Sequence, residues 1–448
     1  MATTSMGNAS FSADESRILF HSNESGIFNA YVMPVTGGKP QPLTQSKTDT
    51  TFSVSFFPDD DRILYMRDQG GNENNHLYVR ELAGAERDLT PGEKLKASFM
   101  GWKPDGSAFY VRTNERDPKA FDLYRYDAKT YARTMLFKNE GAFELGPVSR
   151  DEKWVALDKP NTTIDSNIHL YDVAKDEIRH ITPHQGNVKH DTQTFDPDSS
   201  RLFFLADDGG EFTSVRTYDL ATGAVRVHEK SNWDVAFTYF SRDGRYRVTG
   251  VNEDGRTAVR VVEGLDEKPV TLTGIPQGEI RSVTFSRTGS RMAFYVNGDR
   301  SPSDLYVYDL RARKAKRLTQ ALSRDIDPAD LVDTQVVRFK SFDGMVIPSI
   351  YYKPLTATPQ NRVPAVLLVH GGPGGQSTRG YSSLAQFLAN HGYAVLAINN
   401  RGSSGYGKTF FAADDRKHGR EPLWDCIEAK TFLASLGHVD PARIGIMG

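Results

Sequence analysis

Cysteine is almost absent from this chain of 448 residues, and long hydrophobic runs are absent altogether. The single cysteine, Cys426, excludes an intramolecular disulfide and any zinc site built from several cysteines. The longest apolar candidate, residues 363–369, is far shorter than the roughly 18 residues that a membrane-spanning helix needs. We therefore expect a protein without disulfides and without a membrane partner.

The N-terminus also lacks a basic segment followed by an apolar core, so nothing in it resembles a signal peptide. A cytoplasmic location fits the sequence as given. A periplasmic or secreted location stays open for the case that the N-terminus is incomplete.

An excess of charge of one sign is missing as well. The chain has 55 Lys and Arg residues against 57 Asp and Glu residues, so no global electrostatic field would attract nucleic acid. The basic run at residues 311–317 falls between two predicted strands and is interpreted as a solvated hairpin tip. The acidic run at residues 59–61 lacks the spaced ligands, the glycine and the closing glutamate of a calcium loop. We expect no nucleic-acid partner, no metal and no cofactor.

What the sequence does contain is a repeat that fills its first two-thirds. An aromatic or apolar residue is followed three positions later by Asp, or by Thr in the last unit, and the pattern recurs at intervals of 45 to 47 residues. The seven units begin at Phe11, Phe56, Trp102, Val148, Phe195, Phe240 and Phe285. Such a period is typical of propellers and solenoids.

Each unit predicts four short strands joined by turns rich in Asp, Gly and Ser. A single four-stranded sheet cannot bury both of its faces, whereas seven in a ring bury each face against a neighbour. We therefore predict a seven-bladed, all-β propeller over residues 9–320. Aromatic residues such as Trp102 and Phe240 are assigned to the blade cores rather than to a ligand site.

The pattern changes after the last repeat. Residues 321–333 are interpreted as a linker, and residues 334–448 as the N-terminal part of an α/β domain. We expect strands at residues 334–342, 345–352, 363–370, 393–399 and 443–447, and helices at residues 383–391 and 423–436. This alternation predicts a doubly wound, mostly parallel sheet with its chemistry at the carboxyl ends of the strands. Cys426 falls inside the second helix and is interpreted as a buried apolar residue.

Two glycine-rich segments follow the buried strands. His370-Gly-Gly-Pro-Gly-Gly375 would allow main-chain N–H groups to approach a ligand and to stabilise an oxyanion. A phosphate-binding loop is the competing interpretation, but the proline and the lack of a suitably placed acidic residue weaken it. The segment Asn399-Asn-Arg-Gly-Ser-Ser-Gly-Tyr-Gly407, taken alone, would be a surface loop.

Taken together, these segments resemble the prolyl oligopeptidase family of serine peptidases, in particular its acylaminoacyl-peptidase-like branch. The resemblance rests on His370-Gly-Gly-Pro373, on the segment 399–407, on Trp424-Asp425 with Ala429, and on Val439-Asp-Pro-Ala-Arg-Ile-Gly-Ile-Met-Gly448. It covers nearly the whole chain and implies an N-terminal propeller that caps an α/β-hydrolase domain. It also implies an oxyanion hole at Gly372, helped by Gly371, with His370, Arg401 and Tyr406 as supports of the loops. For Tyr406 a direct contact with substrate stays open as an alternative.

One departure from the family pattern decides how the site is interpreted. The sequence contains no Gly-x-Ser-x-Gly, the motif that carries the nucleophile in this fold, and Gly448 resembles the first glycine of that motif. Because the triad follows in the order Ser, Asp, His, all three residues are expected after Gly448. No catalytic residue is therefore expected within residues 1–448, and this fragment alone should be inactive.

Three functions remain open at this point. The first is a serine peptidase that hydrolyses short peptides beneath a propeller lid, and the second is an esterase or other acyl hydrolase of the same fold. The third is a non-catalytic propeller that binds a partner. The sequence does not distinguish exopeptidase from endopeptidase action, and it leaves the oligomeric state open.

Overall fold

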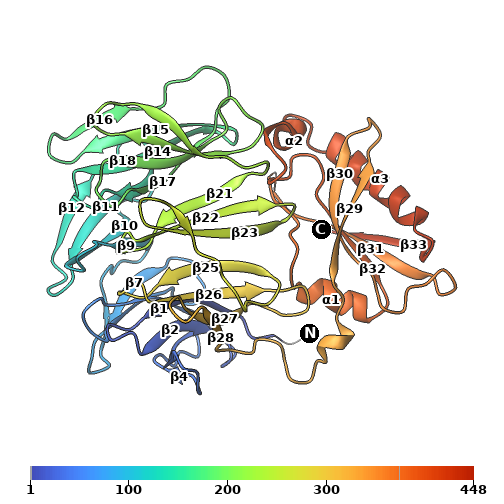
Figure 1. Ribbon diagram of the computed structural model, residues 1–448, viewed down its shortest axis with the longest axis horizontal. Helices are drawn as coiled ribbons and strands as arrows, with labels where there is room; N and C mark the ends of the chain where they lie inside the picture. The colour runs from blue at the N-terminus through green and yellow to red at the C-terminus, as the bar shows by residue number, and fades with distance from the viewer. Residues whose placement is uncertain (1–2, 373) are drawn as a thin grey trace.

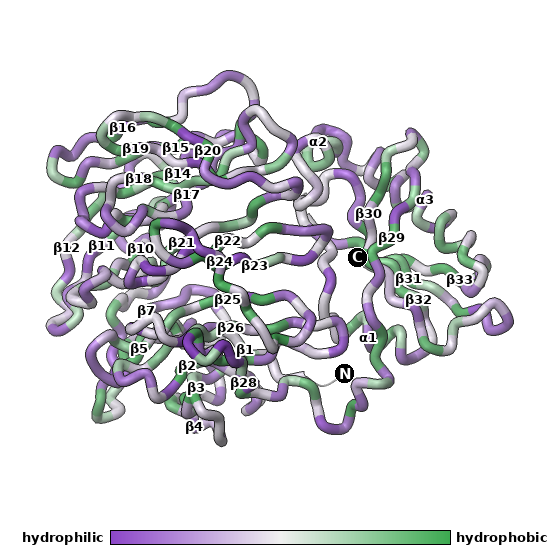
Figure 2. Tube along the Cα trace, viewed as in Figure 1, coloured by the Kyte–Doolittle hydropathy of each residue, from purple (hydrophilic) through white to green (hydrophobic). Residues whose placement is uncertain are grey.

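The computed structural model describes residues 3–372 and 374–448. It has two parts, a ring of β-sheets formed by the first two-thirds of the chain and a smaller α/β part beside it (Figure 1). Figure 2 shows hydrophobic residues concentrated along the strands and hydrophilic residues in many of the connecting turns. Within the described residues no helix is long and apolar enough to cross a membrane.

The ring is a propeller of seven four-stranded antiparallel sheets, as the repeat predicts. Each sheet takes its strands from one continuous stretch of chain, and the first strands of all seven surround a central channel. Blades one to four contain β1 (Met6–Phe11), β2 (Arg17–Ser22), β3 (Asn29–Pro34), β4 (Gln41–Pro42), β5 (Thr51–Phe56), β6 (Ile63–Arg67), β7 (His76–Arg80), β8 (Glu86–Asp88), β9 (Ala97–Trp102), β10 (Ala108–Asp117), β11 (Ala120–Asp127), β12 (Arg133–Phe137), β13 (Glu144–Val148), β14 (Trp154–Thr162), β15 (Asp165–Asp172) and β16 (Glu177–His180). Blades five to seven contain β17 (His190–Phe195), β18 (Arg201–Ala206), β19 (Ser214–Asp219), β20 (Val225–Glu229), β21 (Val235–Phe240), β22 (Tyr246–Glu253), β23 (Arg256–Glu263), β24 (Lys268–Pro269), β25 (Glu279–Phe285), β26 (Arg291–Asn297), β27 (Asp304–Asp309) and β28 (Lys314–Arg317).

The recurring Asp closes the turn between the first two strands of a blade. In blade one, Asp14 accepts hydrogen bonds from the Ser12 hydroxyl (2.5 Å) and from the main-chain N–H of Ser16 (3.0 Å). These bonds, the one from Ser12 first, hold the pKa of Asp14 well below its ordinary value. Asp151 and Asp243 accept the same bond from Ser149 and Ser241. The recurring Asp of the motif therefore stabilises the turn that follows the first strand of these blades.

Seven hydrophobic clusters hold the propeller together, and each is shared by two neighbouring blades. Within residues 3–372 no strand is exchanged between the first and last blades, and an isolated bridge joins Thr3 to Leu322. Instead, Phe20 and Tyr31 of blade one pack in one cluster with Tyr295 and Leu305 of blade seven. The Tyr295 hydroxyl also donates to the main-chain oxygen of Asn8 (2.6 Å).

The connection after the propeller is fixed at several points. Asp304 accepts hydrogen bonds from the Thr319 hydroxyl and from the main-chain N–H of Ala321. A short 3₁₀ helix, η1 (Pro328–Asp330), precedes the buried residues Leu331 and Val332. The stretch therefore packs against both parts of the molecule.

The α/β part has a five-stranded sheet in the order β29-β30-β32-β31-β33. The strand β30 is antiparallel to both β29 and β32, whereas β31 is parallel to both β32 and β33. The described sheet is therefore mixed, and the prediction of a mostly parallel sheet is wrong, because the hairpin β29–β30 adds two antiparallel pairings. Its elements are β29 (Thr334–Lys340), β30 (Val346–Tyr352), β31 (Val363–Val369), α1 (Ser383–Asn390), β32 (Ala394–Ile398), α2 (Lys408–Phe411), η2 (Ala412–Asp414), α3 (Glu421–Ser435) and β33 (Val439–Met447).

Helices cover both faces of this sheet, as expected for a doubly wound fold. Ala385 and Ala389 of α1 pack with Ile350, whereas Ala429 and Leu433 of α3 pack on the opposite side. Cys426 is buried in the α3 cluster, as predicted. The predicted elements all occur with boundaries shifted by a few residues, and the short helix α2 was not predicted.

Candidate active site

The two glycine-rich segments meet at the carboxyl ends of β31 and β32. These strands are parallel and adjacent, so both lead into loops at the same edge of the sheet. In Figure 1 this edge faces the propeller, and the C-terminus lies at the same edge. A Cβ placed on Gly448 would lie 3.2 Å from the main-chain oxygen of Val369, so the end of β33 adjoins the start of the first loop.

His370 joins the two loops. Its Nε2 lies 2.9 Å from the Ser403 hydroxyl, and that hydroxyl donates its proton to the main-chain oxygen of Asn400 (2.6 Å). Because the Ser403 proton is already committed, Nε2 of His370 acts as the donor in this pair. Burial lowers the pKa of His370, although the nearby main-chain oxygen of Gly371 partly opposes this shift.

Gly371 and Gly372 lie at the exposed tip of the first loop. Gly372 has φ +69°, a conformation that glycine adopts without a Cβ penalty. A Cβ at either position would have nothing within 4 Å, so open space surrounds this part of the main chain. Within the described residues neither N–H has a hydrogen-bond acceptor. Pro373, the next residue of the motif, lies outside the described residues.

Arg401 anchors the second loop to the α/β part. Its guanidinium lies 2.8 Å from both Asp425 of α3 and Asp343 of the β29–β30 turn, and its side chain is only 3% exposed. Burial opposes the charge, but the hydrogen bonds to Asp425 and Asp343 raise the pKa of Arg401 above its ordinary value. Arg401 also packs over the Phe342 ring. It therefore positions the loop and does not face the open space.

Tyr406 lies at the far end of the second loop, against the propeller. Its hydroxyl accepts a hydrogen bond from the Asn399 side chain (3.0 Å), and its ring packs edge-on against Trp233 of the propeller. Asn399 also exchanges two hydrogen bonds with the main chain of Ser377, which ties the two loops together again. Burial raises the pKa of Tyr406 to about 12, so the phenol keeps its proton at neutral pH.

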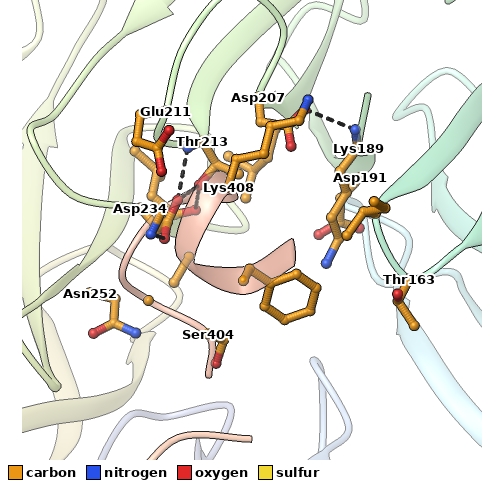
Figure 3. Close-up of a pocket in the computed structure, with 17 residues that line it drawn as sticks. Thr163, Lys189, Asp191, Asp207, Glu211, Thr213, Asp234, Asn252, Ser404 and Lys408 are labelled. Carbon is orange, nitrogen blue, oxygen red and sulfur yellow. Dashed lines mark hydrogen bonds and ion pairs between the residues drawn. The ribbon is translucent and has the colours of Figure 1, made fainter. Parts of the chain in front are cut away.

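Three acidic residues of the propeller dock the second loop, and sequence reasoning missed all of them. Figure 3 shows Glu211 and Asp234 of the propeller beside Lys408, the first residue of α2. Glu211 accepts from the main-chain N–H and hydroxyl of Thr409 (both 2.7 Å), and Asp234 accepts from the N–H of Gly407 (3.2 Å). Asp207 pairs with Lys408 (3.3 Å).

These contacts border a cavity of about 270 Å³ between the two parts of the molecule. The carboxylates that line it are largely engaged in docking. Among the described residues no group of three or more His, Cys, Asp or Glu side chains is arranged to hold a metal ion.

Comparison with known families matches both parts of the chain. The model of the prolyl oligopeptidase N-terminal beta-propeller domain matches residues 42–321, and that of the prolyl oligopeptidase family matches residues 379–448. Dipeptidyl aminopeptidase BIII of Pseudoxanthomonas mexicana is 27% identical over 98% of this chain and 66% of its own length. Dipeptidyl peptidase family member 6 of Caenorhabditis elegans is 20% identical over 95% of this chain and 63% of its own length. An acylamino-acid-releasing enzyme of Arabidopsis thaliana is 35% identical over 19% of this chain and 11% of its own length.

Solved structures show the same fold. A puromycin hydrolase superposes with a TM-score of 0.80 at 17% identity, covering 100% of this chain and 73% of the other. The acylaminoacyl peptidase of Pyrococcus horikoshii superposes with a TM-score of 0.70 at 16% identity, covering 99% and 73%. The chain spans about two-thirds of the length of the curated relatives that it matches throughout. From the propeller match, which alone covers more than half of its residues, the chain belongs to the prolyl oligopeptidase family.

Proposed function

We propose that this chain is the propeller and the N-terminal part of the catalytic domain of a serine peptidase that hydrolyses short peptides. The observation that carries the proposal is the exposed glycine loop after β31, whose N–H groups lie free at the sheet edge that faces the propeller. Two relatives matched along nearly the whole chain are named as a dipeptidyl aminopeptidase and as a dipeptidyl peptidase family member, which agrees with a peptide substrate.

The chemistry proposed for this loop is oxyanion stabilisation. When a serine hydroxyl attacks a peptide carbonyl, negative charge develops on the carbonyl oxygen, and fixed N–H donors stabilise it. We assign the N–H of Gly372, helped by that of Gly371, to this role. His370, Arg401 and Tyr406 are positioning residues, because their contacts hold the two loops against each other, against α3 and against the propeller.

We place the nucleophile, the acid and the base in sequence that follows Gly448 in the whole protein. Two observations support this placement. First, Gly448, which follows β33, lies next to the start of the glycine loop, which is where a nucleophile would need to lie. Second, apolar side chains near β33 and α3 are exposed, among them Ile446 (65%) and Ile427 (55%), as expected if further hydrolase elements cover them.

The position of the propeller favours short substrates. The propeller lies beside the sheet edge that carries the proposed site and is docked on the second loop through Asp234 and Glu211. We therefore expect it to hinder the approach of a folded protein to Gly372. A short, extended peptide meets no such barrier.

The full-length protein tests the proposal. It should cleave dipeptidyl p-nitroanilides and be labelled by a serine-directed fluorophosphonate, whereas the 448-residue chain should do neither. In the full-length protein, Gly372→Ala should lower kcat about 100-fold with little change in KM, because the substitution strains a left-handed turn and displaces the donor. Gly437→Ala, at a position with open surroundings and without positive φ, is the matched control and should keep full activity.

Two results would contradict the proposal. Cleavage of p-nitrophenyl esters with intact anilides would make the protein an esterase. Labelling of the folded 448-residue chain would place a nucleophile within it, and Ser403→Ala and Ser404→Ala variants would then locate the labelled residue.

A further inference from the structure

The third residue of the repeated anchor motif differs among the blades in a way that the propeller fold does not require. It is proline in blades two, three and five, and arginine in blades four, six and seven, namely Arg150, Arg242 and Arg287. The motif forms the turn after each inner strand, so these three side chains gather at one end of the central channel. There they line a cavity of about 460 Å³ to which all seven blades contribute.

This cavity lies at the end of the channel away from the α/β part. The inner strand β17 begins at His190, next to Lys189 and Asp191 of the docking cavity, and ends at Phe195, which lines the arginine cavity. The strand β21 runs in the same way from Val235 to Phe240. A strand of six residues is about 17 Å long, so the arginine cavity is separate from the proposed active site.

The three arginines reach across the ring. Arg150 of blade four donates to the main-chain oxygens of Ser241 and Arg242 in blade six (both 2.9 Å). Arg242 in turn donates to the main-chain oxygen of Pro104 in blade three (3.1 Å). Arg287 of blade seven donates to the main-chain oxygen of Pro58 in blade two (3.2 Å).

Two of these arginines have no counterion in the described part of the chain. Arg287 is paired with Asp59 (3.0 Å), but no carboxylate lies within 4.0 Å of the nitrogens of Arg150 or Arg242. Asp243 and Asp196, the acids whose charges act on Arg150, are bound to Ser241 and Arg201 respectively.

Because Arg150 and Arg242 are partly buried, keeping their positive charges without a counterion costs free energy. Burial lowers the pKa of both Arg150 and Arg242, and the charge of Arg287 lowers that of Arg242 further, while the more distant carboxylates of Asp59 and Asp105 partly oppose the shift at Arg242. Carbonyl dipoles compensate a desolvated cation less well than an anion does. A negatively charged ligand in the cavity would remove this cost.

We propose that the arginine cavity binds a multivalent oxyanion between Arg150 and Arg242. Each guanidinium has five N–H donors, of which Arg150 uses two and Arg242 one in contacts to the protein. The remaining donors suit the paired oxygens of a phosphate or carboxylate group. The cavity is large enough for pyrophosphate or a tricarboxylate.

Isothermal titration calorimetry on the 448-residue chain tests this site without any need for catalysis. The probes are inorganic pyrophosphate and citrate, at constant ionic strength set with sodium chloride. We expect one saturable site per chain and a rise in Tm with the concentration of the bound anion. The probe that binds more tightly tells whether the phosphate or the carboxylate form of the oxyanion is preferred.

Arg242→Gln should weaken binding at least about tenfold, because it removes a charged donor, and Arg150→Gln/Arg242→Gln should abolish it. The matched control is Arg226→Gln/Arg324→Gln, which removes the same charge from exposed positions and should bind like the unchanged chain. No saturable binding by the unchanged chain, or equal loss in the control variant, would overturn the proposal. The first result does not depend on whether any variant folds.

Discussion

Arg401 is buried together with its counterion, and this makes it the most vulnerable residue of the candidate site. The side chain of Asp425 is fully buried, whereas that of Asp343 is 38% exposed. Arg401→Ala should lower the free energy of unfolding of the α/β part by about 3 to 5 kcal/mol, because it leaves Asp425 buried without a cation. Asp343→Asn, which breaks only the exposed pair, should cost less than about 1 kcal/mol. Urea unfolding of both variants measures whether Arg401→Ala loses more stability than Asp343→Asn. Equal losses of stability would contradict the burial assigned to Arg401 and Asp425.

Asp158 predicts a pH dependence in the propeller. Burial, and then the charges of Asp191 and Glu144, raise the pKa of Asp158 to about 7, although the hydroxyl and N–H of Thr192 partly oppose the shift. Between the ordinary carboxyl pKa and about 7 the folded state keeps a proton that the unfolded state has lost. This contribution to stability is therefore present at low pH and is lost as the pH rises through that window.

The Asp158→Asn variant isolates this effect. Its amide oxygen can still accept from the Thr192 N–H, and it carries no charge to bury. At pH 8 it should be more stable than the unchanged chain, by an amount on the order of 3 kcal/mol, and the difference should shrink towards pH 5. Urea unfolding at both pH values measures this. A difference that does not vary with pH would show that Asp158 titrates normally.

Single residues were predictable from sequence only where their role is local. The turn function of the recurring Asp follows from its neighbours two residues away, and it is confirmed. Arg401 was expected to support its loop, but its partner Asp343 lies 58 residues earlier, in the turn between β29 and β30, and nothing in the local sequence indicates this pairing. Trp102 was assigned to the blade core. In the structure it is partly buried against Phe57 in the cluster shared by blades two and three, and it also lines the arginine cavity.

At the scale of elements, α2 is held in place by the propeller. It has only four residues, too few to form a stable helix alone, and Glu211 satisfies the N–H groups at its start. The sequence offered no signal for this, since a period of 3.6 cannot be recognised over four residues and Glu211 lies almost 200 positions away. The longer elements, α1, α3 and the buried strands, were predictable because each is long enough to show a recognisable hydrophobic pattern in the sequence.

The docking by Glu211 can be tested amide by amide. The N–H of Thr409 donates to the Glu211 carboxylate, whereas the N–H of Lys408 donates to the main-chain oxygen of Glu211. In Glu211→Ala, hydrogen exchange at Thr409 should therefore be about tenfold faster, while exchange at Lys408 should change little. Glu211→Gln keeps one acceptor oxygen and should show an intermediate rate. Equal acceleration at both amides would mean that the whole segment has detached.

At the scale of the whole molecule, stability rests on the seven interfaces between blades. Each interface has its own hydrophobic cluster, and the ring is closed by side-chain packing and hydrogen bonds instead of by a shared strand. The repeat predicted the number of blades because every unit has to bury two faces. It could not predict the mode of closure, which depends on contacts between residues almost 300 positions apart, such as Asn8 and Tyr295.

Deletion of one complete unit, residues 193–238, tests whether all seven interfaces are needed. The deletion joins His190–Thr192 of β17 to Tyr239–Phe240 of β21, so the new inner strand has five residues and keeps the anchor residue Phe240 and the turn that follows. The inner strand is therefore shortened by one residue and is otherwise kept. However, blade four would have to pack against a blade that it never meets in the intact ring, and each remaining interface would have to open to a wider angle.

Packed interfaces do not deform gradually, so we expect the six-unit chain to lose cooperative unfolding and to expose its blade faces. Thermal unfolding monitored by circular dichroism, together with size-exclusion chromatography, measures both effects. A deletion within a single exposed turn, residues 69–71, is the control and should leave one cooperative transition, because that turn contributes to none of the seven clusters. A monomeric six-unit chain that melts in one sharp transition would show that the blade interfaces adapt, and that the count of seven is not required for closure.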